Sequence, residues 1–122
     1  MATDRRAEQV IVNEFQERRQ ALSEMASKIN ELRAEVAEHE MVLSALQPMD
    51  PTRKCFRLID TVLVERTVAE VRPAVEKNRE HLTAAVETLM AQASQREKDL
   101  QEFQAKYKIR VVSREESDAM AA

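Results

Sequence analysis

The side chains best suited to chemistry in this chain are a single cysteine and two histidines. Cys55 could act as a nucleophilic thiol or bind a metal, because thiolate sulfur does both. No second cysteine accompanies it, and His39 and His81 do not lie at ligand spacing from it. A residue packed within a β-strand is therefore the better interpretation of Cys55, and the sequence predicts no metal site and no cofactor.

The acidic residues show no arrangement typical of an enzyme. They are spread along the sequence, where exposed helix faces with pairing between residues four apart explain them. The sequence has no Ser-His-Asp set, no phosphate-binding loop and no metal-binding motif. We therefore predict that the chain is not an enzyme.

The composition favours long helices with few connections. The 122 residues include no glycine and only three prolines, so few tight turns are available. Charged residues make up 34% of the chain and aromatic residues 3%, a mixture typical of coiled coils. The length predicts a single domain over residues 1–122.

Charge and hydropathy argue against nucleic-acid and membrane partners. The net charge is −3 with both signs interspersed, whereas nucleic-acid-binding domains cluster their basic residues. No apolar run approaches the roughly 20 residues of a membrane span, and the polar N-terminus does not resemble a signal peptide. We expect a cytoplasmic protein. Exposed surface charge is a simpler interpretation than RNA binding for Arg53, Lys54, Arg57 and Arg66.

Apolar residues recur at heptad spacing through the first third of the chain, which predicts a coiled-coil helix over about 7–47. Pro48 and Pro51 should end this helix, because proline disfavours helix at itself and at the preceding residue. The a positions are Phe15, Leu22, Ile29, Val36 and Leu43, and the d positions are Ile11, Arg18, Met25, Leu32, His39 and Leu46.

A second heptad pattern predicts another helix over about 67–109. A capping box at 67–70 should open it, and Pro73 should kink the helix or mark a restart. The d positions are Val75, Leu82, Leu89, Arg96 and Phe103, and the a positions are Arg79, Val86, Ala93, Leu100 and Tyr107.

Four polar residues interrupt the two predicted seams. His39 could be a pH switch, but a partly solvated residue that sets the helix register is the better interpretation. The three arginines, Arg18, Arg79 and Arg96, can cover apolar surface with their stems while their charged heads reach water.

Between the helices the heptad spacing of apolar residues gives way to two runs rich in β-forming residues, over 53–59 and 62–66. These runs predict the two strands of a β-hairpin. Asp60 and Thr61 stand at a two-residue turn, although Thr is poorly suited to a positive φ, so a longer or distorted turn is an alternative. Phe56, Leu58 and Leu63 should share one face. A lone two-stranded hairpin is marginal in water, so we expect an obligate oligomer assembled through it. The predicted interface residues are Cys55, Phe56, Leu58, Ile59, Val62, Leu63 and Val64.

Two seams of similar length joined by a short insert predict an antiparallel pair of helices, with Leu46 beside Val75 and Ile11 beside Tyr107. The helix ends far from the hairpin then form an apolar tip. This tip could pack internally or bind unfolded protein, since exposed apolar patches mark interaction sites, and the residues leave both readings open. Its members are Val10, Ile11, Val12, Phe15, Phe103, Tyr107, Ile109, Val111 and Val112. Residues 113–122 should be a disordered tail.

The hairpin region resembles that of eukaryotic β-type subunits of the prefoldin family. Residues 50–57 and 62–68 carry the most specific match, and the similarity extends over about 8–112. This chain has Asp60-Thr61 where the family commonly has a Gly-Gly turn. Weaker matches flank the hairpin at Asn30-Glu31-Leu32, Glu38-His39, Glu76-Lys77-Asn78, Glu102-Phe103 and Ile109-Arg110.

The resemblance implies a mainly α fold, in which a long antiparallel two-helix coiled coil carries one β-hairpin between its helices. It also implies a hexamer with two α-type and three further β-type subunits. That complex captures unfolded proteins such as actin and tubulin without ATP, and delivers them to the cytosolic chaperonin. A subunit shared with a related prefoldin-like assembly complex is an alternative. A nuclear location in addition to the cytoplasmic one is also left open. A purely structural coiled coil is disfavoured by the change to β periodicity.

Overall fold

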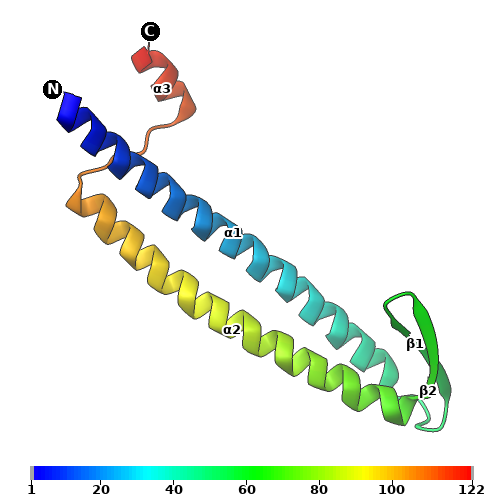
Figure 1. Cartoon of the computed structure of the whole chain (residues 1–122). Helices are drawn as coiled ribbons and strands as arrows, with labels where there is room; N and C mark the ends of the chain where they lie inside the picture. The colour runs from blue at the N-terminus through cyan, green and yellow to red at the C-terminus, as the bar shows by residue number, and fades with distance from the viewer. Residues whose placement is uncertain (1, 122) are drawn as a thin grey trace. The chain divides into compact units, whose positions relative to one another are not determined.

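The computed structural model describes residues 2–121, so Met1 and Ala122 of the predicted 1–122 domain lie outside the described residues. Two long helices with an antiparallel β-hairpin between them make up most of the chain, which confirms the predicted mainly α fold (Figure 1). The elements are α1 (Ala2–Leu46), β1 (Lys54–Ile59), β2 (Val62–Thr67), α2 (Val68–Lys106) and α3 (Arg114–Ala121).

The described residues form two compact units, each of which contains part of both long helices. Within the described residues, one unit comprises 2–24 with 92–121, and the other comprises Met25–Ala91. In the first unit the Phe15 ring stacks on the Phe103 ring, with 6.4 Å between centroids. The Arg18 guanidinium lies 4.6 Å from the centroid of the same Phe103 ring. These contacts join the start of α1 to the end of α2, as an antiparallel pair requires.

The second unit has its core where the hairpin meets the helices. Leu46 of α1 packs against Val68 and Val71 of α2, and Val75 and Cys55 cover this cluster. Burying an aliphatic side chain of this size is worth about 1.5–3 kcal/mol. Val75 packs against the cluster that contains Leu46, so the predicted proximity of these two residues is present. Cys55 packs against the same cluster and so joins β1 to the helices.

The burial pattern follows the predicted heptads closely. Every apolar a or d residue of α1 is buried or half-buried. The same holds for α2, whereas Tyr107, which follows the end of α2, is 40% exposed. Arg18 and Arg96 are exposed, whereas His39 is half-buried and its Nδ1 donates to the Glu35 carbonyl oxygen at 2.7 Å. The polar seam position thus bonds within its own helix.

Arg72 holds the C-terminal end of α1. The last carbonyl groups of a helix have no partner within the helix, and Arg72 Nη2 donates to the carbonyl oxygens of Leu46 at 2.7 Å and Gln47 at 3.3 Å. Val68 and Val71 are buried beside this contact. The second heptad pattern was assigned from Val75 and Arg79 onward. It began one repeat too late to include Val68 and Arg72, which lie seven residues earlier.

The hairpin has a two-residue turn rather than a longer one. Ile59 pairs with Val62, so only Asp60 and Thr61 connect the strands. Asp60 has φ 54°, and it is the turn's only residue in the left-handed region. Asp tolerates that region better than most residues. Thr61 therefore does not need the positive φ that made the turn look unfavourable in the sequence.

The connection between α1 and the hairpin also caps α2. The N–H groups of Val68 and Ala69 donate to the carbonyl oxygens of Arg53 and Pro51, each at 3.0 Å. Asp50 Oδ1 accepts bonds from the hydroxyl and the N–H of Thr52, which hold the pKa of the Asp50 carboxyl below its usual range. The loop is therefore organised by hydrogen bonds and not by glycine.

The start of α2 has the predicted link within the capping box but no restart at Pro73. The Thr67 hydroxyl donates to Glu70 Oε1 at 3.1 Å, which joins the two ends of the predicted capping box through their side chains. Pro73 lies inside α2 without interrupting the helix. It sits near the N-terminus, where the absence of its N–H leaves most of the helical hydrogen bonds intact.

The end of α2 comes earlier than predicted, at Lys106 instead of about 109. Lys108 has φ 54°, the conformation that glycine usually provides after a helix. The Ile109 N–H donates to the Gln104 carbonyl at 3.0 Å, and the Lys108 N–H to the Ala105 carbonyl at 3.3 Å. This pair of bonds is a Schellman motif built without glycine.

The segment predicted to be disordered contains the helix α3. Ser113 caps this helix, because the Glu116 N–H donates to Ser113 Oγ at 3.1 Å. The side chains of α3 are exposed, and its sequence has no repeating pattern of apolar residues from which a helix could be predicted.

None of the helices within residues 2–121 has the length and hydropathy that crossing a bilayer requires.

Candidate functional site

The hairpin presents an apolar face that nothing in the described chain covers. The register places Leu58 opposite Leu63, with Phe56 two residues away on the same face. The exposed fractions are 67% for Phe56, 65% for Leu58 and 65% for Leu63. Three large apolar side chains on one sheet face form a surface suited to another protein layer.

The opposite face of the hairpin is divided between internal packing and exposure. Cys55 and Val64 are half-buried, and Cys55 covers the core cluster of the second unit. Ile59 and Val62, beside the turn, are exposed. The seven predicted interface residues therefore do not act alike. Cys55 packs against the helices and joins the hairpin to them, while the other apolar residues provide most of the exposed apolar surface of the hairpin.

The hairpin also has unpaired edges. The sheet in the described part of the chain has only two strands, so each strand pairs on one side. The outer edges carry N–H and C=O groups that can pair with strands from another chain. A free face and two free edges are what a sheet needs in order to extend across subunits.

The predicted tip separates into packed and open residues. Phe15 is 3% exposed and Phe103 is half-buried, and their rings stack on each other. Ile11, four residues before Phe15, is also half-buried. Ile109 and Val112 are also half-buried. The exposed members are Val10, Val12, Tyr107 and Val111. The seam residues Ile11, Phe15 and Phe103 are therefore packed, whereas the seam residue Tyr107 is exposed. The off-seam residues divide between half-buried and exposed.

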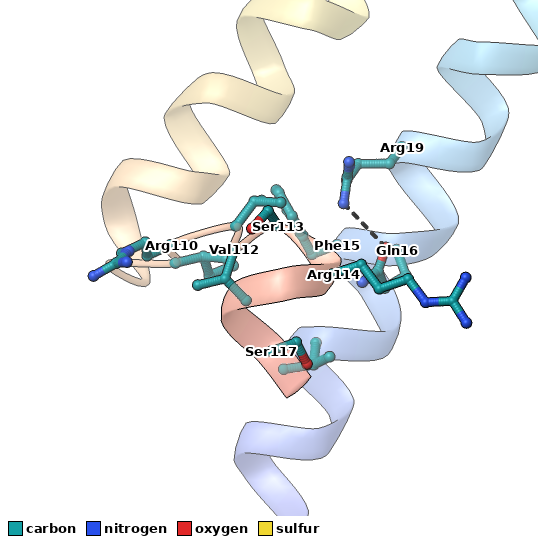
Figure 2. Close-up of a pocket in the computed structure, with 11 residues that line it drawn as sticks. Phe15, Gln16, Arg19, Arg110, Val112, Ser113, Arg114 and Ser117 are labelled. Carbon is teal, nitrogen blue, oxygen red and sulfur yellow. Dashed lines mark hydrogen bonds between the residues drawn. The ribbon is translucent and has the colours of Figure 1, made fainter. Parts of the chain in front are cut away.

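A hollow of about 500 Å³ lies between α1, the 109–113 connection and α3 (Figure 2). Its apolar lining comes from the predicted tip. Its polar lining was missed, because Ser113, Arg114 and Ser117 lie in the segment that was expected to be disordered. The lining residues are Val12, Phe15, Gln16, Arg19, Ile109, Arg110, Val111, Val112, Ser113, Arg114 and Ser117.

The described residues include no group of three His, Cys, Asp or Glu side chains arranged to hold a metal ion.

A smaller hollow of about 220 Å³ is lined by Arg18, Ala21, Arg96 and Asp99, where the polar seam positions of the two helices meet. The features that stand out are surfaces for contact with other chains.

The chain is similar to known prefoldin proteins along nearly its whole length. A family model described as a prefoldin subunit matches residues 9–114. Prefoldin subunit 2 of Arabidopsis thaliana is 46% identical over 110 residues, covering 90% of this chain and 74% of that protein. Prefoldin subunit 2 of Homo sapiens is 45% identical over 113 residues, covering 93% and 73%. The probable prefoldin subunit 2 of Schizosaccharomyces pombe is 37% identical over 112 residues, covering 92% and 98%.

The fold agrees with this similarity. The crystal structure of the prefoldin beta subunit from Thermococcus strain KS-1 superposes with a TM-score of 0.71, at 16% identity, over 80% of this chain and 86% of that one. The family match covers both long helices and the hairpin. With the sequence match over most of its length and the β-type architecture, the chain belongs to the prefoldin family.

Proposed function

We propose that this chain is a β-type subunit of the hexameric prefoldin co-chaperone, assembled with two α-type and three further β-type subunits. In this role it captures unfolded proteins of the actin and tubulin type without ATP, and passes them to the cytosolic chaperonin. The similarity to prefoldin subunit 2 over most of the chain supports this role. It also supports a non-enzymatic role and a cytoplasmic location.

The observation that carries the proposal is the uncovered face of the hairpin. Burying each of Phe56, Leu58 and Leu63 against neighbouring subunits is worth about 1.5–3 kcal/mol. The free edges of β1 and β2 add backbone pairing to the same contact. We therefore assign assembly to the hairpin.

Client capture is assigned to the helix ends. Val10, Val12 and Val111 are exposed and lie off the packed seam. An unfolded client offers many apolar segments but no fixed shape, so each contact is weak. Several subunits acting together raise the avidity by orders of magnitude without any new contact.

Charge substitutions on the hairpin test the assembly role. Leu58→Asp and Leu63→Asp each place a carboxylate in the proposed interface, where an unpaired buried charge is costly. We expect both variants to be absent from the hexamer when all six subunits are co-expressed and the complex is isolated by size. Helix content by circular dichroism should be largely unchanged, because both residues are exposed in the described chain.

Met41→Asp is the matched control, because Met41 is 73% exposed but lies on α1. This variant should enter the hexamer normally. Normal incorporation of both hairpin variants would show that assembly does not depend on this face.

A further inference from the structure

The hollow beside α3 combines an apolar base with polar margins. Val12 and Phe15 of α1 and Val112 of the connection give it apolar surface, and α3 closes one side with Arg114 and Ser117 (Figure 2). Its volume of about 500 Å³ exceeds that of one large side chain and allows a short stretch of extended peptide to enter.

The charge of the hollow is opposite in sign to that of the chain. Arg19, Arg110 and Arg114 line it, and none of its lining residues is acidic. The whole chain carries 22 acidic and 19 basic residues. Arg110 already pairs with Glu116 of α3 at 3.1 Å, and this bond ties the connection to the helix.

Arg19 is positioned at the junction of the apolar and polar surfaces. Its guanidinium lies 5.7 Å from the centroid of the Phe15 ring, and its Nη1 lies 3.5 Å from Gln16 Oε1. Figure 2 shows Arg19 and Arg114 on the opposite side of this view from Arg110. Guanidinium groups bind carboxylates with two parallel hydrogen bonds and are weakly hydrated.

We propose that this hollow selects, among unfolded clients, extended segments in which an apolar side chain is flanked by carboxylates. The apolar side chain enters beside Phe15, and the flanking carboxylates meet Arg19 and Arg114. The inference rests on the proposed client-capture function and adds a preference for charge to it. Apolar contact alone distinguishes sequences poorly, whereas charge complementarity supplies specificity and steers encounter.

The test uses the assembled hexamer and three short peptides that share one central photo-crosslinking aromatic residue. The flanks of that residue are Asp and Glu in one peptide, Ser in another and Lys in the third. Crosslink yield on this chain is measured by mass spectrometry, so that the tips of the other subunits do not contribute. We expect the acidic peptide to label this chain about two- to tenfold more than the Lys peptide. The difference should shrink at high salt, because exposed charges are screened.

Charge reversal identifies the residues responsible. Arg19→Glu/Arg114→Glu should abolish or invert the preference. Lys77→Glu/Lys98→Glu makes the same change in charge on exposed residues of α2 outside the hollow, and should keep it. The milder Arg19→Gln/Arg114→Gln variant serves if charge reversal prevents assembly, and should remove the preference without inverting it.

The outcomes separate this inference from the function on which it rests. Equal labelling by the three peptides, or a preference that survives both arginine variants, overturns the charge selection while leaving client capture intact. If the hexamer labels with none of the peptides and does not suppress aggregation of a denatured protein, both the proposed function and this inference fail.

Discussion

Arg72 shows how one side chain can connect both long helices where the hairpin begins. It extends from α2 to the carbonyl oxygens of Leu46 and Gln47 at the end of α1. A hydrogen bond to a charged donor contributes about 1.5–3 kcal/mol. The contact also fixes the end of α1 beside the core residues Leu46 and Val71.

We expect Arg72→Leu to lower the free energy of unfolding by about 1–3 kcal/mol, because two carbonyl groups lose a charged donor. Urea unfolding of the assembled complex, with a reporter on this subunit, measures the change. Lys77→Leu, at an exposed position of the same helix, should change stability by less than about 0.5 kcal/mol. Equal effects of the two substitutions would mean that the Arg72 contact adds little.

At the scale of elements, the end of α2 is stabilised by a motif that lacks its usual residue. A left-handed helical conformation costs a non-glycine residue about 1–2 kcal/mol, and Lys108 adopts it with φ 54°. Gln104 supports the turn twice, through its carbonyl and through a bond from its side-chain amide to the Ile109 carbonyl at 3.1 Å.

Glycine substitutions at two nearby lysines should therefore act in opposite directions. Lys108→Gly should raise the free energy of unfolding by up to about 1 kcal/mol, because the strain is relieved. Lys106→Gly, within the last turn of α2, should lower it by about 0.5–1 kcal/mol. Thermal unfolding of complexes carrying each variant tests the pair. A loss of stability in both would contradict the assigned role of the turn.

Elements with a strong period were predictable from the sequence, and those without one were not. The seams of α1 and α2 repeat over many heptads, so Ile29, Leu32 and Val86 were placed correctly in the packed face. The helix α3 buries none of its side chains, and its formation depends on the cap at Ser113. The turn at Asp60 depends on a single positive φ, which residue type alone does not determine.

The candidate sites were predicted in the same uneven way. Strand alternation correctly placed Phe56, Leu58 and Leu63 on one face, because the side-chain period of a strand is two. The tip residues were named without knowing which of them pack. That distinction comes from the Phe15–Phe103 stacking, which joins positions far apart in the sequence. The arginine lining of the hollow needed α3 and was not foreseen.

At the scale of the whole molecule, the chain is built to be completed by other chains. A two-stranded hairpin is marginal by itself in water, and this one exposes both of its edges and one apolar face. Folding of the isolated chain leaves that surface in contact with solvent. We therefore propose that assembly contributes to the stability of the subunit as well as to its function.

Sedimentation of the purified chain, alone and mixed with the other five subunits, tests this account most directly. Alone at micromolar concentration, the chain should self-associate or be incompletely folded, because Phe56, Leu58 and Leu63 lack partners. In the mixture it should move into a single species with the mass of a hexamer. A fully folded, stable monomer that remains monomeric in the presence of the other subunits would contradict the account.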